Sequence, residues 1–200
     1  VLDFLSMSRD HLSMSRDEST VHTTSHGATD STMHRRDRVD EIVGQWNAER
    51  PDVDVSAMAI IGRISRIERL IRPRLEEVFQ QHELESWEFD VLATLRRTGS
   101  PHELTPGQLL DSTMVTSGAM TNRLDRLESR GFVGRRRSPT DGRQVLVSLT
   151  DTVRTIVDAA LVDHAANELR LIESLDAEQR DALVDLLRAL IEGIDRAAER

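Results

Sequence analysis

Apolar residues recur at every third or fourth position along most of the chain after residue 36, a spacing typical of amphipathic helices. This spacing predicts seven helices, over residues 37–49, 55–81, 85–97, 106–112, 116–130, 151–173 and from 177 onward. Pro73 lies inside the second helix, where it predicts a kink or a restart because proline has no amide hydrogen to donate.

Strand-like patterns are confined to the stretch between the fifth and sixth predicted helices. Alternating apolar residues predict a strand over 144–149, and the segment 132–137 predicts its antiparallel partner. The turn 138–142 between them contains Pro, Asp and Gly, and 99–104 is predicted to be a loop. Two short helices followed by a hairpin predict a winged helix-turn-helix. The expected fold is therefore mostly α-helical with a small β-hairpin wing.

Composition and motifs argue against several classes of protein. The chain has no cysteine, which excludes disulfides and thiolate metal sites. No apolar run approaches the roughly 20 residues of a membrane helix, and the N-terminus lacks a signal core, so we expect a cytoplasmic protein without a membrane partner. Without a phosphate-binding loop, a His-containing metal cluster or a nucleophile motif, we expect no enzyme, no metal and no cofactor.

The net charge of −9 is unevenly distributed along the chain. Residues 116–143 hold seven Arg and three acidic residues, whereas residues 144–200 hold six Arg and twelve acidic residues. A short basic segment in an otherwise acidic chain is what DNA phosphates would attract. We therefore expect double-stranded DNA to bind the predicted winged unit.

A helical wheel divides the predicted helix 116–130 into two faces. Met120, Leu124 and Leu127 lie together and predict the core face. The outward residues and those at the helix start are the candidates for the major groove: Thr116, Ser117, Gly118, Thr121, Asn122 and Arg126. Asn pairs well with adenine and Arg with guanine. The alternative is an ordinary solvent-exposed helix face.

The predicted hairpin carries further candidates. Arg136 lies on its first strand between two other arginines, and Arg143 follows the turn. An arginine at a hairpin tip suits the narrow minor groove, where the negative potential is enhanced. Asp141 would hold the Arg143 side chain or shape the turn. The alternative is an arginine-rich edge that only prevents aggregation.

The segment LTPGQLLDSTMVTSGAMTNRLDRLESRGFVGRRRSPTDGRQVLVSLT, residues 104–150, resembles the MarR family of bacterial regulators, and the likeness extends more loosely over 55–190. Members typically carry Asp-x-Arg at the wing tip, here Asp141-Gly142-Arg143. The resemblance implies a homodimer that binds a pseudopalindromic operator. It also implies that a small ligand relieves binding, with repression the usual mode.

The extra N-terminal helix carries Trp46 and is followed by ERPDVD at 49–54, and in this it resembles the urate-responsive branch of the family. The resemblance implies an effector pocket formed by Trp46, Asp90, Arg123 and Arg135, with urate as the first candidate ligand and a tricarboxylate such as citrate as the second. The wheel places Arg123 about 60° from the core centre, where its charge needs a partner or an anion. The alternative is a structural Arg–Asp pair with a core Trp.

Taken together, these patterns predict five segments. A Ser-, Thr-, Asp- and His-rich tail at 1–33, which repeats LSMSRD, is expected to be disordered. Four segments follow the tail. They are an added helix with its linker at 34–54, the dimerisation and pocket helices at 55–104, the DNA-binding unit at 105–150 and the C-terminal dimerisation helices at 151–200. The alternative function is a helical dimeric protein-interaction module, which a salt series in gel shifts would distinguish from a DNA binder.

Overall fold

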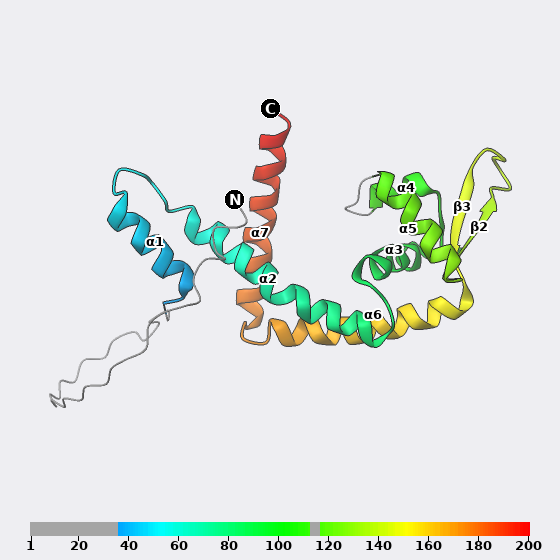
Figure 1. Cartoon of the computed structure of the whole chain (residues 1–200), viewed down its shortest axis with the longest axis horizontal. Coiled ribbons are helices and arrows are strands. Elements are labelled where there is room, and N and C mark those ends of the chain that lie inside the picture. The colour runs from blue at the N-terminus through cyan, green and yellow to red at the C-terminus, as the bar shows by residue number, and fades with distance from the viewer. Residues whose placement is uncertain (1–35, 113–116) are drawn as a thin grey trace. The chain divides into compact units, whose positions relative to one another are not determined.

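The computed structural model describes residues 36–112 and 117–200, which form seven helices and three short strands (Figure 1). The helices are α1 Arg38–Glu49, α2 Met58–Gln81, α3 Ser86–Arg97, α4 Pro106–Ser112, α5 Ser117–Ser129, α6 Asp151–Leu171 and α7 Ala177–Ala198. The strands are β1 Glu103–Leu104, β2 Val133–Arg137 and β3 Val145–Leu149. These elements confirm the predicted mostly helical, winged class. The predicted tail 1–33 lies outside the described residues.

The chain divides into two compact units, with the boundary inside α2 between Arg69 and Leu70. In the first unit, α1 begins at an Asp37 cap, whose carboxylate accepts hydrogen bonds from the backbone N–H groups of Val39 and Asp40. Val39 is buried, and Gly62 of α2 leaves it room, since a Cβ atom there would lie 3.0 Å from the Val39 side chain.

Helix α2 begins later than predicted. It begins at Met58 rather than residue 55, because the Met58 N–H donates to the Val55 carbonyl in a tight turn (2.9 Å). The Asp54 carboxylate accepts the Ser56 N–H and holds the chain before that turn. Pro73 lies within one continuous helix, so the predicted restart does not occur.

The core of the second unit lies between α3, α5, α6 and the sheet. Helix α3 is its central element, with Val91, Leu92 and Leu95 fully buried. Phe79 at the end of α2 stacks on Phe89 of α3, with ring centroids 4.4 Å apart. This packing removes the apolar face of α3 from water and provides the surface against which α5 and the wing are held.

The sheet has three antiparallel strands in the order β1-β3-β2, one more than the predicted hairpin. The segment predicted as a loop contains β1, whose Glu103 and Leu104 pair with Ser148 and Val147 of β3. Two residues are too few for an alternating pattern, so only the pairing with β3 defines this strand. In the hairpin, β2 and β3 pair from Val133 opposite Leu149 to Arg137 opposite Val145.

The two C-terminal helices have opposite environments. Helix α6 begins at a Thr150 cap and buries three side chains, whereas α7 begins at an Asp176 cap and buries none within the single chain. Apolar residues nevertheless line one side of α7: Leu183, Leu186, Leu187, Ile191 and Ile194. Among the described helices, none has an apolar stretch long enough to cross a lipid bilayer.

Candidate nucleic-acid interface

Helix α5 has the two faces that the wheel predicts. Met120, Leu124 and Leu127 are each at most 2% exposed, and they enter the core with the sheet. Thr121 and Asn122 are exposed on the other side. The helix begins at Ser117, with Gly118 next, while the predicted cap Thr116 lies outside the described residues. The exposed polar side chains of α5 are therefore accessible to a groove of DNA.

Arg126, which the wheel turns outward, lies back against α3. Its guanidinium donates to a Glu85 carboxylate oxygen (2.7 Å) and lies 4.7 Å from the centre of the Trp87 ring. The pKa of Glu85 is lowered, chiefly by the hydrogen bond from Trp87 and further by the charge and hydrogen bond of Arg126. Arg126 thus joins α5 to the start of α3, a contact that the sequence did not predict.

A second arginine joins the same two helices one turn later. Arg130 at the end of α5 pairs with the fully buried carboxylate of Glu88 (2.5 Å), donates to the Glu83 carbonyl and lies over the Phe132 ring. The other Glu88 oxygen also lies below the surface, without a hydrogen-bond partner among the described residues. A buried carboxylate depends on its paired cation, so Arg130 is structural here.

The arginines of strand β2 also have acidic partners. Arg135 pairs with Asp125 (2.6 Å) and Glu128 (3.5 Å) of α5. Arg136 binds Glu103 of β1 through two nitrogens (2.8 and 2.5 Å), and this pairing lowers the pKa of Glu103. These contacts hold the base of the wing to α5 on one side and to β1 on the other.

The wing tip, in contrast, presents cationic side chains. Asp141 accepts the backbone N–H of Arg143 (3.0 Å), so of the two predicted roles the structure gives it the shaping of the turn. The Ser138 hydroxyl accepts the N–H groups of Thr140 and Asp141 and closes the turn. Arg137 and Arg143 are exposed and have no ion pair within the described ranges.

The four residues predicted to bind an effector come from both units. Trp46 is half-buried on α1 in the first unit, whereas Asp90, Arg123 and Arg135 belong to the second. Loss of contact with water is the main influence on the pKa of Asp90 and raises it, and the charges of Arg123, His164 and Arg97 partly oppose this rise. Asp90 and Arg123 therefore interact electrostatically, although no ion pair within 4 Å joins them in the described structure. His164 and Arg97 were not predicted at this site.

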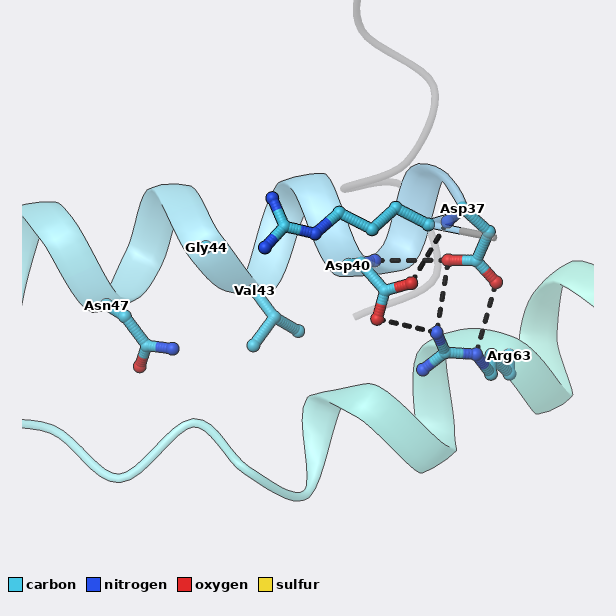
Figure 2. Close-up of a pocket in the computed structure, with 7 residues that line it drawn as sticks. Asp37, Asp40, Val43, Gly44, Asn47 and Arg63 are labelled. Carbon is cyan, nitrogen blue, oxygen red and sulfur yellow. Dashed lines mark hydrogen bonds and ion pairs between the residues drawn. The ribbon is translucent and has the colours of Figure 1, made fainter. Parts of the chain in front are cut away.

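A polar notch lies between α1 and α2 in the first unit (Figure 2). Arg63 of α2 donates to the carboxylates of Asp37 (3.1 Å) and Asp40 (2.7 Å), which cap the start of α1. The notch, of about 560 Å³, is also lined by Val43, Gly44 and Asn47. Because Arg63 pairs with both carboxylates, it attaches the added helix α1 to α2, and Arg36 also lines the notch.

Comparison with known proteins agrees with this geometry. Residues 84–145 match the model of the MarR family, which spans α3 to the start of β3. The HTH-type transcriptional regulator PecS of Dickeya dadantii is 39% identical over 155 residues, which cover 78% of this chain and 93% of PecS. A mutant of MarR from E. coli in complex with operator DNA has a TM-score of 0.59 at 28% identity, over 72% of this chain and 96% of the other. BpsR of Bordetella bronchiseptica, whose DNA binding is regulated by 6-hydroxynicotinic acid, has a TM-score of 0.53 at 25% identity, over 64% and 91%.

The raised pKa of Asp90 predicts that its charge opposes folding. The folded chain takes up a proton between the ordinary pKa of 3.8 and the raised value, so its stability falls as the pH rises through that interval. We therefore expect Asp90→Asn to be more stable than the wild type at pH 7. In thermal unfolding followed by circular dichroism, this advantage should shrink as the pH falls through the raised pKa and vanish below about 3.8.

Glu103→Gln is the control for Asp90→Asn, because it should change the stability at pH 7 in the opposite direction. Arg136 lowers the pKa of Glu103, so this carboxylate stabilises the fold above its ordinary value of 4.5, and the contribution is lost as the pH falls through the lowered pKa. Glu103→Gln should thus be less stable at pH 7 and equal to the wild type in strong acid. An Asp90→Asn chain that is less stable at pH 7 would contradict the assignment.

Proposed function

Because the chain belongs to the MarR family of DNA-binding transcriptional regulators, we propose that it binds a pseudopalindromic operator as a homodimer, represses transcription, and is released by a small anionic metabolite. Urate is the first candidate effector and a tricarboxylate such as citrate is the second. The observation that supports the proposal is that the winged unit has two sides with different surroundings. Its inward side is buried or ion-paired, whereas the outer face of α5 and the wing tip are exposed.

On this proposal, the two exposed parts read different features of DNA. Thr121 and Asn122 lie in the first half of α5, together with Ser117 and Gly118, where a recognition helix contacts base edges in the major groove. Arg143 at the wing tip suits the minor groove, because its guanidinium has no ion pair among the described residues. Arg136 and Arg126 would first have to leave their carboxylates to contact phosphate.

Apolar side chains that a single chain leaves exposed support the homodimer. Ile60, Ile67 and Leu70 of α2 are 52–61% exposed, and the apolar side of α7 is 41–69% exposed at Leu187 and Leu186. Exposed apolar surface of this extent is typical of protein interfaces. A second copy of the chain would bury these helices and present two α5 helices about one DNA turn apart.

The surroundings of Arg123 support an anionic effector. Its guanidinium is half-buried, has no ion pair within the described ranges, and acts on the Asp90 carboxyl from a distance. An incompletely paired cation in a partly dry site attracts a carboxylate or urate anion. The ligand of BpsR, 6-hydroxynicotinic acid, carries a carboxyl group, which is compatible with this chemistry.

Arg143→Ala should weaken operator binding by about tenfold or more, because each protomer of the dimer loses its wing-tip cation from the minor groove. The slope of log affinity against log salt should decrease by about two units, since the dimer carries two copies of Arg143. Fluorescence anisotropy on a duplex that the wild-type chain selects from a random pool would measure both. Arg50→Ala removes the same charge from the linker after α1 and should change neither quantity. Equal effects of the two variants would indicate a general charge effect.

Leu187→Glu should convert the dimer to a monomer, because it places a charge in the middle of the apolar side of α7. Operator affinity should fall about a hundredfold or more, since two half-sites are no longer bound together. Ala189→Glu adds the same charge on the opposite side of α7 and should remain dimeric. Sedimentation velocity distinguishes the two, and a dimeric Leu187→Glu chain would refute the role of α7.

Arg123→Ala should abolish the effect of the ligand on DNA binding. The measured quantity is the ratio of operator affinities with and without urate, and then with and without citrate, supported by calorimetry of each ligand alone. Arg123→Lys keeps the charge and should retain part of the response. If Arg123→Ala responds to the active ligand as the wild type does, then the effector site lies elsewhere.

A further inference from the structure

Trp87, in the first turn of α3, is held in one orientation on two sides. Its ring packs against the hydrophobic core of the second unit and is half-buried there. Its indole N–H donates to a Glu85 carboxylate oxygen at 2.6 Å. An aromatic ring that is fixed by packing and by a hydrogen bond offers a flat surface whose position is determined by the core.

Two arginines of the proposed recognition helix rest on this ring. The guanidinium carbons of Arg123 and Arg126 lie 5.4 and 4.7 Å from the ring centre. Both distances are within the range of a cation–π interaction, which is about 6 Å. Because residues three apart lie on one side of a helix, both contacts orient the same side of α5 toward α3.

Glu85 completes the arrangement through its second carboxylate oxygen. One oxygen accepts the Trp87 N–H and the other accepts Arg126 at 2.7 Å, so a single carboxylate fixes both the ring and one of the cations on it. The hydrogen bond from Trp87 and the charge of Arg126 lower the pKa of Glu85. The Glu85 N–H in turn donates to Glu88, which anchors the start of α3.

We propose that Trp87 is a positioning residue for DNA recognition, whose ring sets the rotation of α5 by holding Arg123 and Arg126 while Glu85 fixes the ring. The proposal rests on the proposed function of α5 as the DNA-reading helix. The hydrophobic face of α5 fixes which side is inward, but apolar contacts are not directional. A ring that contacts two cations at defined places restricts the rotation of α5 about its axis. Base contacts at Asn122 require that this rotation is defined.

The role of Trp87 differs from that of a phosphate contact in a measurable way. Replacing Trp87 removes no positive charge from the chain, so binding to a duplex of unrelated sequence should be unchanged. Binding to the selected operator should weaken, because correct base contacts need the fixed orientation of α5. The relevant quantity is therefore the ratio of the two affinities rather than either one alone.

The experiment uses the full chain and a duplex that the wild type selects from a random pool, with a scrambled duplex of equal length. Trp87→Leu should reduce the selected-to-scrambled affinity ratio by about five- to thirtyfold for each half-site, the size expected from the loss of two exposed cation–π contacts. Trp87→Phe keeps a ring without the N–H and should retain most of the ratio. Recovery with Phe identifies the ring face, since Leu and Phe both fill apolar space.

Several outcomes would overturn the proposal. A Trp87→Leu chain with the wild-type ratio would show that α5 needs no such ring, and equal losses in Phe and Leu would show that the aromatic face does not hold α5. Should Trp87→Leu unfold at the assay temperature, Glu85→Gln decides the matter, because it releases Arg126 and should lower the ratio about twofold to threefold. An unchanged ratio in Glu85→Gln then overturns the proposal. If the wild type selects no sequence from the pool, the proposed function itself fails, which is a result distinct from a wild-type ratio in the Trp87 variants.

Discussion

The burial of one face of α5 is the constraint on which the winged unit depends. Met120, Leu124 and Leu127 lie in the same core as Val133 of β2 and Val147 of β3. Because the helix repeats every 3.6 residues, burying these three side chains decides which side of α5 faces outward. The hairpin cannot shift against α5 without opening that core. The outer face of α5 and the wing tip are thus held by the same apolar contacts, which is the arrangement that reading two grooves of DNA requires.

The second constraint is electrostatic. Within the described winged unit, Arg126, Arg130, Arg135 and Arg136 pair with carboxylates, while the wing-tip arginines do not. The local excess of positive charge in the sequence is therefore concentrated in space at the tip. Ion pairs at exposed positions contribute little stability, so phosphate can replace the pair at Arg136, but not the buried pair at Glu88.

The sequence predicted the elements and the core face of α5, because both follow from local periodicity. It missed β1, since a two-residue strand has no pattern of its own and exists only through pairing with β3. It also missed the contacts of Arg126, whose partner Glu85 is 41 positions away. A helical wheel gives the direction in which a side chain leaves the helix, but a long arginine can bend back along the surface. Glu88 and Trp87 were likewise recognisable only once α3 and α5 were placed together. The predicted effector residues stay a prediction.

The helical wheel predicted an outer face of α5 for DNA and an inner flank at Arg123 for a ligand. Trp87 connects the two, because its ring contacts an arginine from each. Arg123 influences Asp90 and rests on the same ring as Arg126. An anion that draws Arg123 toward itself would remove one of the two cations from that ring, so that α5 would be held by Arg126 alone. A change of this size is within the coupling of about 1–3 kcal/mol that switches commonly use. On the proposed function, release from DNA would need no unfolding and no large movement, only a rotation of α5 that separates its exposed donors from the base edges.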